Sequence, residues 1–174
     1  MNYYETALLL DARDAVRDAA LAYELAISEQ NAPLAAYLNL AVLYFNCLDF
    51  GYASHHRLEP EFVNIAEQRL KDVLARAHGT FGESGEIRFW RLFFDFVQTG
   101  TSPGIDEWLK IAEAGDTKLP FMYLFVFANQ SNYRAEAEKL VASTKGETAR
   151  ERYIRSVIDG AMKRYSARNA TQAS

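Results

Sequence analysis

The feature of this 174-residue sequence that most constrains its fold is the run LAAYLNLAVLYFN at residues 34–46. No helix-breaking residue follows Pro33, and apolar side chains recur on nearly every turn of a helix. A stripe at relative spacings of 0, 3, 4 and 7 is formed by Tyr37, Leu40, Ala41 and Tyr44. A small residue between large aromatic ones lets a neighbouring helix approach closely. The run therefore predicts a helix packed tightly against a second helix.

The rest of the chain predicts further helices, because apolar residues recur every three or four positions between breaks rich in glycine, proline and asparagine. We expect about eight helices, at residues 4–29, 34 to about 49, 60–79, 86–99, 105–114, 121–128, 133–143 and 148–165. Segment 51–59 lacks periodicity and is predicted to be a loop. The apolar run 121–128 is also compatible with a buried strand, but we favour a helix because a single strand has no pairing partner.

The stripe in residues 34–46 resembles the first helix of a tetratricopeptide repeat, whose aromatic, leucine, small and tyrosine positions align with its four residues. Ala66 fits the small residue of the second helix, although segment 51–59 is then an insertion. Phe93 stands where the family prefers a small residue. The resemblance implies an all-α fold of antiparallel helix hairpins, stacked as a short tetratricopeptide-like (TPR-like) α-solenoid with a C-terminal capping helix at 148–165.

Composition and charge indicate one water-soluble domain. The chain is 49% apolar and 24% charged, which is ordinary for a globular protein. We expect one domain over residues 1–168 and a disordered tail at 169–174. The net charge of −4 gives no reason to expect nucleic-acid binding, which needs clustered lysine and arginine. Acidic residues dilute the more basic segment 134–168.

The sequence predicts a cytoplasmic protein that does not bind a membrane. The first residues lack the pattern of a secretory signal. No apolar run approaches the roughly 20 residues that span a bilayer. Cys47 is the only cysteine, so no intramolecular disulfide forms.

Few residues suggest chemistry. Cys47, His55 and His56 could ligate zinc, but their spacing is not that of recognisable metal sites, and a buried cysteine beside a solvated loop is the favoured interpretation. The aromatic segments 89–96 and 121–127 suggest either a cofactor or lipid pocket or, more often, core. We therefore predict no catalytic residue, no cofactor and no metal, and expect that the protein is not an enzyme.

The resemblance implies a concave face, lined by the first helix of each hairpin, in which a protein or peptide partner docks. An asparagine such as Asn39 can donate to and accept from a peptide backbone, and Arg91 can bind a carboxylate by two hydrogen bonds. An equally open alternative is that Asn39 and Asn46 bond only to neighbouring helices or water. The residues expected on this face are Asn39, Val42, Asn46, Arg91, Asp95 and Tyr123.

The resulting hypothesis is a non-enzymatic protein–protein interaction module, acting as an adaptor, chaperone or inhibitor of a partner protein. The alternative is an enzyme, or a helical protein that binds a small ligand or metal near segment 51–59. A third possibility is self-association as a homodimer through apolar helix faces.

Overall fold

The computed structural model describes residues 2–172, and within that range the chain is all-α with no strand. The elements are α1 (Tyr3–Ala12), α2 (Val16–Ser28), α3 (Leu34–Cys47), α4 (Phe50–His55), α5 (Pro60–Phe81), α6 (Gly85–Thr99), α7 (Ile105–Glu113), α8 (Pro120–Val126), a short 3-10 turn (Ser131–Tyr133), α9 (Arg134–Ala142) and α10 (Ala149–Gln172). The all-α prediction is confirmed, including the helix predicted at 121–128. In the same range no helix combines the length and apolar character needed to cross a membrane.

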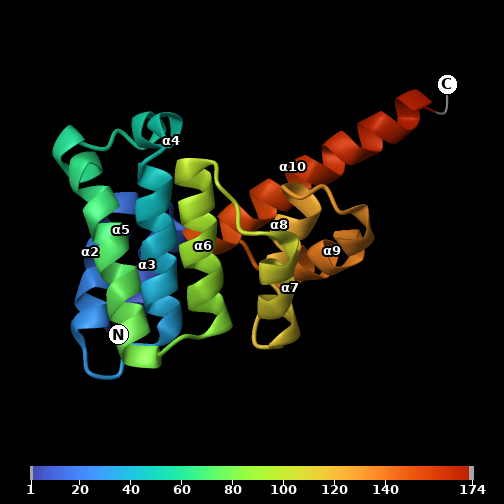
Figure 1. The fold of residues 1–174 in the computed structure, drawn as a ribbon. Helices are drawn as coiled ribbons and strands as arrows, with labels where there is room; N and C mark the ends of the chain where they lie inside the picture. Colours follow the sequence, from blue (N-terminus) through green and yellow to red (C-terminus); the bar gives the residue numbers. More distant parts are fainter. Residues whose placement is uncertain (1, 173–174) are drawn as a thin grey trace.

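Helix α3 lies at the centre of one block of helices, with α2, α5 and α6 around it (Figure 1). The predicted stripe is buried, and Ala41 has no exposed surface. Tyr37 meets Phe81 near the end of α5 at 5.6 Å between ring centroids. Tyr44 meets Phe62 near the start of α5 at 6.0 Å. Helices α3 and α5 therefore pack antiparallel, and the close packing that the stripe predicts for α3 is confirmed.

The single helix predicted at 4–29 was wrong, because the chain turns between α1 and α2. Asp14 adopts a φ of 60°, a left-handed conformation that aspartate tolerates better than most residues. Its carboxylate accepts a hydrogen bond from Arg152 at 3.0 Å. The turn lets α1 fold back on α2, although no glycine or proline marks it in the sequence.

The loop predicted at 51–59 was also wrong in its first part, which forms the short helix α4. The side chain of Asp49 accepts a hydrogen bond from the backbone N–H of Tyr52 at 2.8 Å. Aspartate at this position stabilises the start of a helix by satisfying an otherwise unpaired backbone donor. Asp49 therefore ends the connection from α3 and starts a new helix.

Aromatic side chains form the core of the second block, which comprises α7, α8 and α9 against α6 (Figure 1). Phe93 is fully buried in α6 and stacks on Phe89 at 5.5 Å. Trp108 of α7 stacks on Tyr123 of α8 at 4.2 Å. The two aromatic segments identified in the sequence contact each other, with Phe93 against Phe127 at 5.5 Å and Phe96 against Tyr123 at 5.2 Å. Phe93 thus fills space that a small residue would leave empty.

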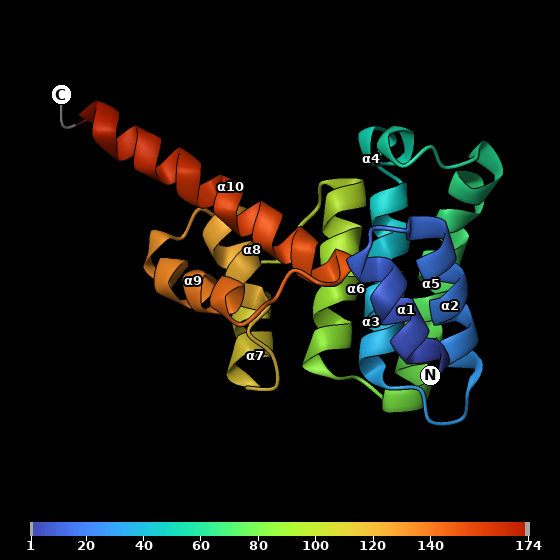
Figure 2. The same ribbon diagram turned by 180° about the vertical axis from the view of Figure 1, so that it is seen from behind.

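Helix α10 returns across the molecule and packs on α3, α8 and α9, so it contacts helices far from it in sequence. Figure 2 shows its first turn beside α1 and its last turns projecting away from the body. In an idealised solenoid each unit contacts only its neighbours, and α10 departs from that rule. The helix continues to Gln172 and so includes part of the predicted tail; residues 173–174 of that tail lie outside the described residues.

The start of α10 is joined to α1 by the buried carboxylate of Asp11, which is 1% exposed. One carboxylate oxygen accepts from the backbone N–H of Ala149 at 2.8 Å and from Arg152 at 2.9 Å. The other accepts from the hydroxyl of Tyr23 at 2.9 Å. These bonds hold three helices together at one point.

Candidate functional site

A groove with a volume of about 650 Å³ opens between α5 and α6. Helix α5 packs mainly against α3 and makes few contacts with α6, which packs against α7 on its other side. Space is therefore left between α5 and α6. The floor is apolar and is formed by Leu70, Leu74, Leu92 and Phe94. Phe94 is fixed there because its ring stacks on Phe45 of α3 at 4.5 Å.

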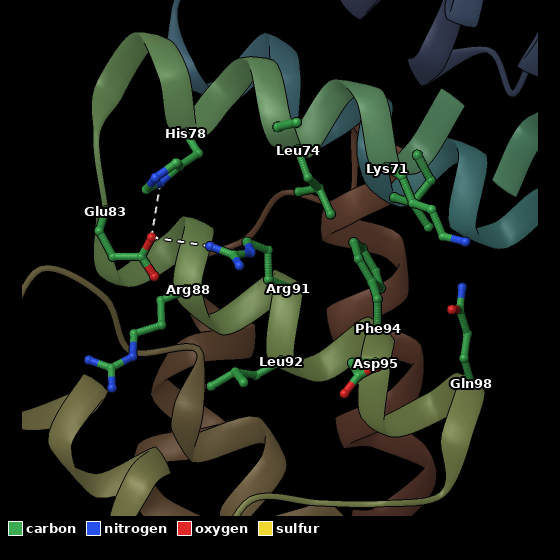
Figure 3. Close-up of a pocket in the computed structure, with 12 residues that line it drawn as sticks. Lys71, Leu74, His78, Glu83, Arg88, Arg91, Leu92, Phe94, Asp95 and Gln98 are labelled. Atoms are coloured by element: carbon green, nitrogen blue, oxygen red, sulfur yellow. Dashed lines mark hydrogen bonds and ion pairs between the residues drawn. The ribbon is translucent and has the colours of Figure 1, made fainter. Parts of the chain in front are cut away.

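The walls of the groove are charged, as Figure 3 shows. Glu83, from the connection between α5 and α6, lies between two basic side chains. Its Oε2 is 2.9 Å from Nδ1 of His78 on α5 and accepts a hydrogen bond from Nη1 of Arg91 on α6 at 3.3 Å. Because all three side chains are about half exposed, solvent screens these ion pairs and each contributes little to stability.

Two other polar side chains of α6, Asp95 and Gln98, line the groove without a hydrogen bond or ion pair to the side chains that the structure describes, residues 2–167. Arg88 lies on the same wall but pairs with Glu107 of α7. Lys71, on the opposite wall, pairs with Glu67 one turn earlier in α5, at 2.6 Å. The groove thus combines an apolar floor with polar side chains, some of which pair with other residues of the protein and some of which do not.

Of the six residues predicted to bind a partner, Arg91 and Asp95 lie together in this groove. Asn46 lines a separate hollow of about 470 Å³, whose walls include Phe45 and Tyr153. Gln98 lines both spaces, so the hollow adjoins the groove along α6.

The prediction of an exposed face was wrong for Asn39, Val42 and Tyr123, which are buried with exposures of 2%, 0% and 6%. The amide nitrogen of Asn39 donates to the hydroxyl of Tyr23 on α2 at 3.2 Å. Tyr123 donates its hydroxyl to Ser102 at 2.6 Å. Neighbouring helices cover the predicted face, and the alternative in which Asn39 bonds to a neighbouring helix is the one observed.

Sequence reasoning missed the contribution of α5 and of the connection after it. Lys71, Leu74 and His78 line the groove from α5, and Glu83 reaches it from the connection. The break at residues 79–85 contains a usable signal, because a hairpin brings the end of one helix and the start of the next together. The polar residues at and beside this break, His78, Glu83 and Arg91, therefore become neighbours.

The possible zinc ligands do not gather into a site. Cys47 is fully buried, and its thiol donates to the carbonyl of Leu43 at 3.1 Å. Burial raises the pKa of Cys47 to about 12, so the thiol stays protonated at neutral pH. His56 instead lies against the Tyr52 ring at 4.3 Å. Over the described range no three histidine, cysteine or acidic side chains converge as metal ligands would.

Comparison with known proteins identifies no relative: no family model matches the chain, and no curated protein or solved structure matches it either. The functional proposal therefore depends on the groove and its chemistry.

Proposed function

We propose that this protein is a non-enzymatic interaction module that binds a segment of a partner protein in the groove between α5 and α6. The observation that carries the proposal is the apolar floor flanked by charged walls, with Asp95 and Gln98 free to bond to a ligand. Peptides bind helical proteins by burying apolar side chains in such a groove, while polar groups at the rim fix their orientation.

The dimensions of the groove suit a short stretch of polypeptide. The wall from Lys71 to His78 rises about 10 Å along α5, a length that an extended peptide covers with about three residues. A volume of about 650 Å³ is within the range of pockets that bind small ligands and side chains. We infer that the groove takes an anchor segment, while the rest of the partner contacts the surrounding surface.

The TPR-like arrangement remains part of this proposal. Ala41 and Ala66 are both fully buried in α3 and α5, where the resemblance places the small residues of a helix hairpin. In that interpretation the groove separates this hairpin from the next helix along the chain. An adaptor, a chaperone and an inhibitor would all use such a surface, in the cytoplasm or elsewhere.

The proposal predicts that a charge reversal at Arg91 reduces partner capture. Purified Arg91→Glu protein is incubated with an extract of its native cells. We expect it to capture about one tenth of the partner that wild type captures, or less, which is the effect of replacing a central residue of an interface. Ala75→Trp, at an exposed alanine on the groove wall, should have a similar effect by filling the space. Quantitative mass spectrometry of the captured proteins measures the change.

The matched control is Arg164→Glu, the same charge reversal at an exposed site on α10, which should leave capture unchanged. Circular dichroism and the melting temperature establish that each variant is folded. Equal capture of the same proteins by wild type, Arg91→Glu and Ala75→Trp would contradict the proposed groove.

A further inference from the structure

Glu83 is a carboxylate held by two basic side chains at one end of the groove. It lies between His78 of α5 and Arg91 of α6, which together form the donor pair of this site (Figure 3). The distances from Oε2 are 2.9 Å to Nδ1 of His78 and 3.3 Å to Nη1 of Arg91. Both donors belong to helices, whereas the acceptor comes from the connection between them. The backbones of the donor pair are therefore held in helices, whereas the acceptor comes from a connection and is the part that can be exchanged.

The backbone on either side of Glu83 has structural roles that the Glu83 side chain does not share. Gly82 ends α5 with a φ of 72°, a conformation that favours glycine. The Ser84 hydroxyl accepts a hydrogen bond from the backbone N–H of Ile87 and so starts α6. The Glu83 side chain is 44% exposed, and among the described side chains it forms ion pairs with the two donors alone. It can therefore rotate away while both helix ends stay in place.

Arg91 is the cation through which the groove can take an acidic occupant. Lys71 and Arg88 also line the groove, but they pair with Glu67 and Glu107, whereas the ion-pair partner of Arg91 is Glu83 itself. When Glu83 turns away, Asp95 is the one carboxylate left on the lining, although the whole chain carries a net charge of −4. The apolar floor lies beside the donor pair, so an apolar side chain next to the incoming carboxylate is buried at the same time. A nucleic acid would offer charge without such a side chain.

We propose, on the basis of the function proposed above, that the groove recognises a partner segment with an aspartate or glutamate next to an apolar residue. In this proposal the segment's carboxylate replaces Glu83 between His78 and Arg91. Glu83 is thus an internal competitor, which holds the donor pair in the free protein and is displaced on binding.

The test uses the full chain and a display library of random peptides, selected for binding to the immobilised protein. The selected peptides should be enriched in an acidic residue beside an apolar one. A fluorescent copy of the best binder is then titrated with each variant and followed by anisotropy. Glu83→Ala should tighten binding about threefold, because the competing carboxylate is removed. Arg91→Gln should weaken it at least about tenfold, whereas Arg164→Gln should have no effect.

The outcomes separate this inference from the proposed function. Loss of peptide binding in Ala75→Trp supports the groove as the binding site. If the selected peptides are then not enriched in acidic residues, or if Glu83→Ala does not increase their affinity, the acidic-segment proposal is overturned and the proposed groove is kept. Displacement of the peptide by heparin at equal charge concentration would also overturn it, because the site would then recognise charge alone. Peptides unaffected by every groove variant, or the absence of any selected binder, would count against both. Circular dichroism and melting temperatures again show that the variants are folded.

Discussion

Replacing Asp11 with alanine is expected to lower the free energy of unfolding by about 3 kcal/mol. The carboxylate is 1% exposed and accepts hydrogen bonds from the Tyr23 hydroxyl, the Ala149 N–H and the Arg152 guanidinium. Without it, the buried hydroxyl and the N–H at the start of α10 lose their acceptor. A buried donor that is left unpaired costs more than the hydrogen bond contributed when it was formed.

Chemical denaturation measures this change, and Asp14→Asn is the control, because asparagine also tolerates the left-handed backbone at this position. Asp14 accepts a hydrogen bond from the same arginine at 3.0 Å but is 48% exposed. Loss of its charge should cost less than about 1 kcal/mol, as for a surface ion pair. An Asp11→Ala variant no less stable than Asp14→Asn would show that the contact between α1 and α10 does not hold the fold together.

Asp11→Asn should cost less than Asp11→Ala, because the amide keeps a hydrogen-bond acceptor and avoids burying a charge. Burial raises the pKa of the Asp11 carboxyl, and the hydrogen bonds from Tyr23, Arg152 and Ala149 offset only part of that effect. A carboxyl whose pKa is raised by folding favours the folded state when protonated. Its contribution is present below the unfolded pKa and is lost as the pH rises through the folded pKa. The free energy of unfolding of Asp11→Asn, measured as a function of pH, should therefore lack the decrease that the Asp11 carboxyl causes as the pH rises.

Phe93→Ala should lower the free energy of unfolding by about 4 kcal/mol, which is typical of removing a buried aromatic ring. The Phe93 ring is fully buried, stacks on Phe89 and meets Phe127 and Tyr153 edge to face at 5.5 Å and 6.0 Å. It therefore joins α6 to the segment after α8 and to α10. Truncation leaves a cavity that α6, α10 and the segment after α8 would have to move together to close.

The control for this variant is Phe50→Ala, because Phe50 is 88% exposed. Its replacement should change stability by no more than about 0.5 kcal/mol. Denaturant midpoints and slopes of the two variants give the comparison. A small loss in Phe93→Ala would mean that α6 and the second block of helices do not share one cooperative core.

The sequence predicts those elements whose packing is local. The stripe at Tyr37 and Tyr44 predicts α3 and the face that it buries, since spacing alone decides which side chains share a face; that α5 covers this face is seen only in the structure. The breaks between helices are harder to predict from the sequence. The turn at Asp14 is stabilised by Arg152, a contact between residues far apart in the chain, so no local pattern reveals it. Asp49 is a local helix-start signal, but α4 is too short to show periodicity.

Only part of the candidate site could be predicted from the sequence. Arg91 and Asp95 are one helical turn apart on α6, and their polarity beside the buried aromatic face places them on its outer side. Asn39 and Val42 were misplaced because the resemblance assigned them an open face, whereas in this chain α2 and other helices cover α3. The wall formed by α5 could not be predicted, because periodicity does not determine how far α5 and α6 lie apart.

The most direct test of the groove as the partner-binding surface is site-specific photo-crosslinking. A benzophenone amino acid replaces either Lys71, a long and exposed side chain on the groove wall, or Ile65, exposed on α5 outside the groove. Each protein is irradiated in an extract of its native cells, and crosslinked partners are identified by mass spectrometry. We predict that a specific partner crosslinks from position 71 and not from position 65. A partner that crosslinks from position 65 alone, or equally from both positions, would contradict binding in the groove.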